Sequence, residues 1–216
     1  MKKMNAKEVI IKLPKLFLGF ALCALGITLL LKANLGMNPW GTFTSGLVNI
    51  TGLSFGQLTQ LIGLFIIIAT LPIKSIPGIG TLLNMYFIGI FIDLFSNLSW
   101  LATPDHFLLQ LTMCFMGLFI LSFGIYVYLS CGLGAGPRDG LMIALIKITN
   151  SSATFVKPMI EITVTIVGIL LGGPLGIGTV IVALSGGRIL DYFFKKFKYD
   201  PKEHAQTTLL DFFKTA

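Results

Sequence analysis

The stretch GLGAGPRDGLM, residues 132–142, places a charged pair, Arg138 and Asp139, inside one of the most apolar parts of the chain. An arginine fork can hold a carboxylate or a phosphate through two parallel hydrogen bonds. Pro137 suits the first position of a helix, and Gly136 before it suits the N-cap. Free backbone amides at a helix N-terminus carry about half a positive charge and attract anions. The segment therefore predicts an anion-binding site. The alternative is an interfacial pair that caps a helix and fixes its topology.

Three other acidic residues lie in apolar segments, where an ionised carboxylate costs about 2.5 to 3.5 kcal/mol on insertion scales. Glu161 follows Lys157 on the same helical face, and this spacing predicts either an ion-coupling group or one half of a structural ion pair. Asp93 and Asp191 each fall near the end of an apolar segment. Their positions are compatible with ion coupling and with helix capping.

The remaining reactive side chains show no pattern of a metal site or a catalytic centre. The three cysteines and two histidines are widely separated along the chain: Cys23, Cys114, Cys131, His106 and His204. None of them forms a C-x-x-C motif or lies in sequence beside a group that would activate it as a nucleophile. We therefore expect no enzyme activity, no metal and no cofactor.

The composition indicates an integral membrane protein. The 216 residues are 55% hydrophobic and 12% charged, with a mean hydropathy of +0.88, against about 45–50% apolar and 25% charged in soluble domains. The net charge of +7 arises largely from basic residues near the termini, beside apolar spans, as expected at a cytoplasmic membrane face. We expect membrane lipids around the protein and no nucleic-acid partner.

The chain contains two related halves. Shifted by 98 residues, positions 17–95 align with 115–193 without a gap, and 21 of 79 pairs are identical. The identities concentrate on residues with backbone roles, among them LG at 35–36 and 133–134, proline at 39 and 137, and GIGT at 78–81 and 176–179. A tandem duplication explains this pattern.

Each half predicts three helices long enough to cross about 30 Å of hydrocarbon at about 1.5 Å per residue. Between the first and the second of them lies a helix too short to span alone, at 39–51 and at 137–149. The predicted spans are 14–33, 55–73 and 77–97 in the first half, and 107–130, 154–172 and 174–194 in the second. The predicted fold is therefore all-α and polytopic.

Basic residues near the span ends indicate the orientation. If the N-terminal segment 1–13 and the tail 195–216 are cytoplasmic, 15 of the 16 basic residues fall on the inner side and Lys32 on the outer side. Because each repeat has an odd number of spans, repeat 1 (14–97) and repeat 2 (107–194) then enter the membrane from opposite sides. This arrangement is the inverted-topology repeat of many secondary transporters.

Both repeats interrupt the apolar sequence at the same depth, which predicts one central site. The counterpart of GLGAGPRDG is NLGMNPWGT, with Asn38 as the N-cap. Irregular backbone at membrane depth is tolerated only where protein covers it or where it lines a cavity. The predicted substrate-binding residues are Gly36, Asn38, Pro39 and Trp40 from the first break, and Gly134, Gly136, Pro137, Arg138 and Asp139 from the second.

GLGAGPRDGLM and the upstream ANLGMNPWGTF together resemble the paired signatures of the YczE/YyaS/YitT-type family of bacterial inner-membrane proteins, over roughly residues 15–195. Relatives are expected to carry Pro-Trp-Asp or a similar triplet at the first site, whereas here Gly41 follows Pro39 and Trp40. The resemblance implies a compact bacterial multipass protein and names no substrate.

These features predict a small secondary transporter or permease of the bacterial plasma membrane for a small solute, with an anion favoured. The alternative is a non-transporting membrane factor that binds a protein partner, since such a factor would also lack catalytic residues. A chain of 216 residues is short for a transporter, and this size is compatible with a homodimer.

Overall fold

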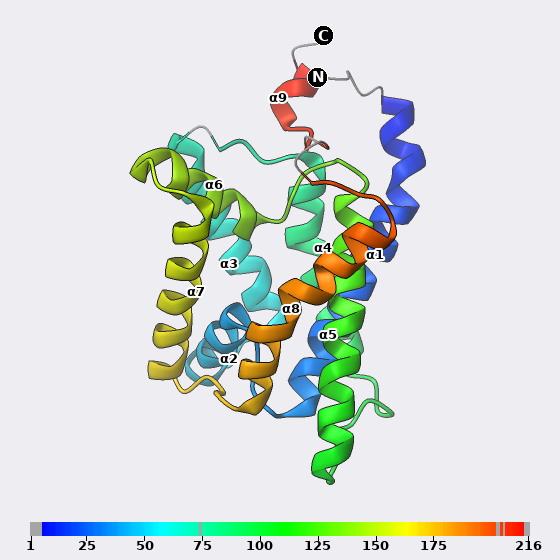
Figure 1. The fold of residues 1–216 in the computed structure, drawn as a ribbon, viewed down its shortest axis with the longest axis vertical. Coiled ribbons are helices and arrows are strands. Elements are labelled where there is room, and N and C mark those ends of the chain that lie inside the picture. Colours follow the sequence, from blue (N-terminus) through cyan, green and yellow to red (C-terminus); the bar gives the residue numbers. More distant parts are fainter. Residues whose placement is uncertain (1–5, 74, 202–203, 205, 214–216) are drawn as a thin grey trace.

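The computed structural model describes residues 6–73, 75–201, 204 and 206–213, which are all-α (Figure 1). The long helices are α1 (Ala6–Ala33), α3 (Phe55–Thr70), α4 (Ile79–Ser96), α5 (Phe107–Leu129), α7 (Ala153–Leu170) and α8 (Ile177–Lys196). The short elements are α2 (Pro39–Thr51), the 3₁₀ turn η1 (Leu71–Ile73), α6 (Pro137–Thr149) and α9 (Leu209–Phe213). The predicted all-α class is confirmed.

Five helices in the described part of the chain are long and apolar enough to cross a membrane: α1, α3 continued by η1, α4, α5 and α8. The sixth predicted span, α7, is 18 residues long and carries Lys157, Pro158 and Glu161, and it is not among these five. Residues 6–13 continue the first helix through Pro14. Several basic residues that support the predicted orientation lie outside the described residues: Lys2, Lys3, Lys74, Lys202 and Lys214.

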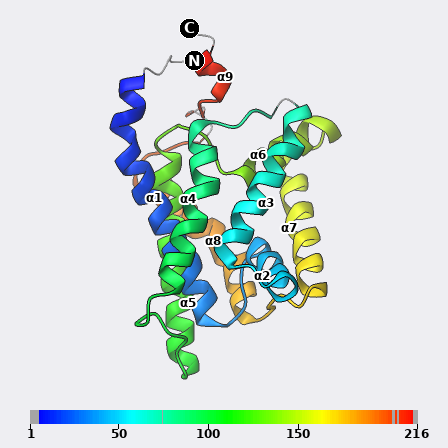
Figure 2. The same ribbon diagram turned by 180° about the vertical axis from the view of Figure 1, so that it is seen from behind.

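Both short helices begin and end where the sequence predicts. Asn38 is the N-cap of α2, and its side-chain oxygen accepts a hydrogen bond from the Gly41 amide at 2.7 Å. Gly136 is the N-cap of α6. Pro39 and Pro137 stand at the first helical positions, where no amide hydrogen is needed. Figures 1 and 2 show α2 and α6 toward opposite ends of the molecule.

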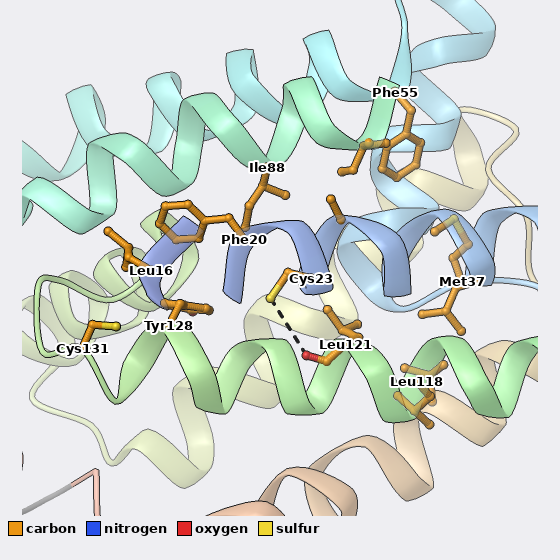
Figure 3. Packing of buried hydrophobic residues seen from close by; sticks show 14 of the residues in the cluster. Leu16, Phe20, Cys23, Met37, Phe55, Ile88, Leu118, Leu121, Tyr128 and Cys131 are labelled. Carbon is orange, nitrogen blue, oxygen red and sulfur yellow. Dashed lines mark hydrogen bonds between the residues drawn. The ribbon is translucent and has the colours of Figure 1, made fainter. Parts of the chain in front are cut away.

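Helices α1 and α5 form the centre of the core, where the buried apolar side chains of Figure 3 pack. Glycines set the separation of the two helices. An added Cβ on Gly26 would lie 2.6 Å from the Leu121 backbone nitrogen, and one on Gly124 would lie 2.7 Å from that of Cys23. Small residues allow this close approach, and packing rather than the hydrophobic effect joins helices in lipid. The recurring glycines of the two halves therefore meet at one helix crossing.

Gly26→Ala should lower the stability of the folded protein by about 1–3 kcal/mol, the cost of overpacking a core. The new methyl group would meet the backbone of α5. Gly187→Ala on α8 is the matched control, because nothing lies within 4 Å of a Cβ added there. Thermal unfolding of the purified variants in detergent checks this, and equal midpoints would contradict the packing role of Gly26.

The two halves contact each other through residues that recur between them. The Gly80 amide donates a hydrogen bond to the Leu133 carbonyl at 2.7 Å, and the Gly178 amide donates one to the Leu35 carbonyl at 2.7 Å. Helix α2 packs on α7 while α6 packs on α3, and the α1–α4 contact has its counterpart in α5–α8. The LG motif of each half thus docks on the GIGT motif of the other, which gives both motifs a structural role.

The C-terminal tail folds back onto the second half. The Tyr199 hydroxyl donates a hydrogen bond to the Leu129 carbonyl at 3.0 Å. The Gln206 side-chain oxygen accepts one from the Gly134 amide at 3.2 Å, and the Thr207 amide donates one to the Gly132 carbonyl at 3.0 Å. Backbone groups and uncharged side chains make these hydrogen bonds. The docking of the tail could therefore not be predicted from its polar composition.

Candidate functional site

The residues of the first break are largely engaged within the protein. The Asn38 side-chain oxygen caps α2. Gly36 has a φ of +99°, and an added Cβ there would lie 2.5 Å from the Thr179 hydroxyl oxygen. The Thr42 hydroxyl donates a hydrogen bond to the Pro174 carbonyl at 3.1 Å. Asn38 and Gly36 therefore shape and support this break, and the side chain that extends toward the second break is that of Trp40.

Arg138 lies over the ring of Trp40, with its guanidinium carbon 5.0 Å from the ring centroid. Positions 40 and 138 are equivalent in the two repeats, so the two breaks meet at the first turns of α2 and α6. A cation–π contact holds the guanidinium and leaves its N–H donors unused. Arg138 makes no hydrogen bond or ion pair with any described residue. Its donors are therefore available to an anion.

Polar groups gather around Gly136. An added Cβ there would lie 3.5 Å from the Tyr128 hydroxyl oxygen, 3.6 Å from Asn84 Oδ1 and 3.8 Å from Asp139 Oδ2. The charges of Asp139 and Arg138 both act on Tyr128. We call Asn84, Tyr128, Arg138 and Asp139 the polar cluster.

Asn84 is a cluster residue that sequence reasoning missed. It is 8% exposed, and its side chain makes no hydrogen bond with another described residue. Among the buried polar side-chain atoms of the described residues, Ser96 Oγ is the one that is both enclosed and unpartnered, so the Asn84 amide is not completely enclosed. Comparison of the two repeats gives a sequence signal for Asn84, because the equivalent position in the second half is Val182. Asn84 thus puts a polar group where the other half has a buried apolar one.

Lys157 of α7 is exposed, and its positive charge acts on Asp139 of the polar cluster. Lys157 and Arg138 are the basic groups whose charges act on Asp139. The described residues contain no ion pair between Lys157 and Glu161, and Glu161 is half-buried on α7. Two positive charges against one negative charge leave the cluster and Lys157 together net positive. Such a balance favours an anion.

The two predicted aspartates have different surroundings. The Asp93 carboxylate accepts hydrogen bonds from the Ser54 hydroxyl at 2.5 Å and from the Gly56 amide at 2.9 Å. Asp93 therefore caps the first turn of α3, a helix other than its own. Asp191 is exposed and makes no hydrogen bond or ion pair with the described residues. Neither aspartate lies in the polar cluster.

A pocket of about 270 Å³ adjoins the second break. Its walls include Thr81 of α4, Gly136 and Pro137 of the break, and Gln206 of the tail. A larger pocket of about 400 Å³ lies between α3 and α4 on an apolar face, but Gln60, one of its two glutamines, already donates to the Tyr86 carbonyl at 2.8 Å. The pocket beside Gly136 is not lined by the four residues of the polar cluster, and it approaches the cluster through Gly136 and Pro137, which immediately precede Arg138 in the chain. The tail forms part of its wall.

Comparisons with known proteins agree with the membrane character of the chain. An uncharacterized protein of Haemophilus influenzae is 36% identical over 176 residues, which cover 81% of this chain and 80% of that protein. The uncharacterized membrane protein YczE of Bacillus subtilis is 34% identical over 188 residues, which cover 86% of each chain. The uncharacterized protein YyaS of the same bacterium is 26% identical over 178 residues, 82% of this chain and 89% of YyaS.

No solved structure matches the chain. The resemblance to YczE and YyaS that the two glycine–proline motifs indicate is confirmed over most of the length. Residues 10–195 match a family of unknown function, DUF6198. The chain therefore belongs to the DUF6198 family and is a bacterial multipass membrane protein.

Proposed function

We propose that this protein is a small secondary transporter that moves a small anion across the bacterial plasma membrane. The observation that carries the proposal is Arg138, a half-buried guanidinium held over Trp40 with no hydrogen-bonded acceptor among the described residues. A buried charge is costly unless it is paired. The charge of Asp139 acts on Arg138, and an anionic solute supplies the hydrogen-bond acceptor that the guanidinium lacks among the described residues.

The chemistry of the site suits a small anion with one or two acceptor oxygens. Arg138 provides a planar fork for two parallel hydrogen bonds, and the Asn84 amide provides a further N–H donor. Lys157 adds a second positive charge, and Asp139 reduces the total to one positive unit. This limited charge favours a monoanion and permits its release.

The two halves form an inverted-topology repeat in this proposal. The exchanged contacts support it, because α2 packs on α7 just as α6 packs on α3. The excess of basic residues at one set of span ends supports cytoplasmic termini. With α7 counted as a span, each half crosses the membrane three times, and the polar cluster lies where the two halves meet.

Anion binding by the purified protein tests this function. Isothermal titration with sulfate, phosphate and acetate should detect binding of at least one of them. Arg138→Lys should weaken that binding by about tenfold or more, because lysine keeps the charge but loses the fork and its charge-assisted bonds. Arg188→Lys, the same substitution at an exposed position of α8, should leave binding unchanged.

Two outcomes would count against the proposal. Binding that survives Arg138→Ala would show that Arg138 is a surface cap. Binding without uptake into proteoliposomes would favour the non-transporting membrane factor. Uptake of the bound anion that Arg138→Ala abolishes, in protein of unchanged stability, is the expected result.

A further inference from the structure

A short segment of the tail, residues 206–209, runs along the second break, and we call it the strap. The Gln206 side-chain oxygen accepts a hydrogen bond from the Gly134 amide at 3.2 Å. The Thr207 amide donates one to the Gly132 carbonyl at 3.0 Å. The strap is therefore bonded to the backbone of the second half on both sides of the residue that separates these two glycines.

The strap is also bonded to the first half. The Leu209 amide donates a hydrogen bond to the Pro77 carbonyl at 2.9 Å, and a Cβ added to Gly78 would collide with the Thr207 carbonyl oxygen. Figures 1 and 2 show α9, which begins at Leu209, at the same end of the molecule as α6. The strap thus ties the two halves together where they meet beside the second break.

The strap forms a wall of the pocket beside Gly136. Three of its four residues, 206–208, line this space of about 270 Å³. The pocket is also lined by Gly136 and Pro137, which immediately precede Arg138 in the chain. Docking of the strap therefore closes one side of the space that leads to the break carrying Arg138.

The first break has the same structure without a strap. Gly36 and Gly134 both have a positive φ, +99° and +127°. In both breaks a 2.7 Å hydrogen bond joins the LG motif to the GIGT motif of the other half. The Gly36 amide makes no hydrogen bond with another described residue, whereas the Gly134 amide is bonded to Gln206. A strap is therefore not needed to shape a break of this kind.

The strap is suited to local opening. Its four residues are half-buried rather than buried, and α9 beyond it has five residues, too few to be stable as a helix alone. The range that matches the family ends at residue 195, before the strap. Segments held by few contacts open while the remainder of a protein stays folded.

We propose that the strap is a gate, which closes the pocket beside the second break when docked and opens it to water when released. Gln206 is the positioning residue of this gate, because its side chain bonds the Gly134 amide and also donates to the Leu129 carbonyl at 3.2 Å. The purpose of the gate rests on the proposed transport function, since a transporter site opens to one side at a time. With the tail in the cytoplasm, the strap closes the cytoplasmic side.

Reaction of a cysteine in the pocket tests the gate without any solute. Ser75 lines the pocket and is half-buried, and Ser75→Cys changes its size little. The three native cysteines are buried, so their background reaction is low. A bulky maleimide, larger than the pocket, should label Ser75→Cys slowly in the purified full-length protein. Adding Gln206→Ala should raise the labelling rate about tenfold, the effect of losing the hydrogen bonds to the Gly134 amide and the Leu129 carbonyl.

Leu209→Pro is a second variant that releases the strap. Leu209 is the first residue of α9, where proline fits a helix, and the substitution removes the amide that bonds the Pro77 carbonyl. It should also raise the labelling rate of Ser75→Cys.

Two matched controls accompany these variants. Gln110 is also half-buried, and its side chain donates to the Pro104 carbonyl at 2.9 Å near the start of α5, the end away from Leu129. Gln110→Ala should therefore leave the labelling rate of Ser75→Cys unchanged. Ser152→Cys, at an exposed position, should react equally fast with and without Gln206→Ala.

Two results would overturn the gate. One is a labelling rate of Ser75→Cys that neither Gln206→Ala nor Leu209→Pro raises in folded protein. The other is loss of folded protein in both variants with no faster labelling of the folded fraction, which would make the strap a fixed part of the fold. Faster labelling in a protein that binds none of the tested anions would support the gate and count against the proposed function. Anion binding with an unchanged labelling rate would do the reverse.

Discussion

Gly134→Ala should prevent most of the protein from reaching its folded state, whereas Gly136→Ala should leave the folded state intact. Gly134 has a φ of +127°, which favours glycine, and an added Cβ would lie 2.6 Å from the Thr81 hydroxyl oxygen and 2.9 Å from the Gly78 Cα. Backbone strain and overpacking each cost about 1–3 kcal/mol. Together they approach the whole stability of many domains, about 5–15 kcal/mol.

Gly136 differs because its φ of −61° suits any residue and its nearest neighbour would be 3.5 Å from an added Cβ. That neighbour is the Tyr128 hydroxyl, and the methyl group would stand among the polar atoms of the cluster. We therefore expect Gly136→Ala to fold and to bind anions more weakly. Yield after size-exclusion chromatography and titration with the anions that bind the unaltered protein check both parts. Equal yields of the two variants would contradict the structural role assigned to Gly134.

Local signals allowed the short helices to be predicted to the residue. Proline at a first helical position and asparagine or glycine before it act within one turn, so sequence alone fixes where α2 and α6 begin. The 98-residue repeat identified LG and GIGT as important motifs, but a repeat does not say what each copy touches. That the Gly80 amide bonds Leu133, and the Gly178 amide Leu35, depends on how the two halves pack.

Tertiary contacts decided the parts of the site that sequence reasoning missed. The spacing of Lys157 and Glu161 predicts a pair along one helix as one alternative, but in the fold the charge of Lys157 acts on Asp139 of α6. An asparagine within an apolar helix could equally be a packing residue with a helical partner. Comparing Asn84 with Val182 at the equivalent position supplies the one sequence signal for it. The stacking of Arg138 on Trp40 joins two breaks that are far apart along the chain.

Asn84→Val should make the folded protein more stable and make anion binding weaker. Asn84 is 8% exposed and makes no hydrogen bond with another described residue, and a polar group so far removed from solvent without a protein partner costs up to about 1–3 kcal/mol. Valine already occupies the equivalent buried position, Val182, in the second half. Removal of the amide also removes an N–H donor to the anion, and affinity should fall by about tenfold. Thermal unfolding and isothermal titration on the same preparation measure both effects.

Thr28→Val is the matched control for this prediction. Thr28 is also buried, but its hydroxyl donates a hydrogen bond to the Ala24 carbonyl at 2.9 Å, within α1. Replacing a satisfied hydroxyl should leave stability unchanged or slightly lower it, and it should not alter anion affinity. Opposite shifts in stability and affinity for Asn84→Val would separate a ligand-binding group from a structural one. If Asn84→Val instead lost stability and kept its anion affinity, Asn84 would be a core residue outside the binding site.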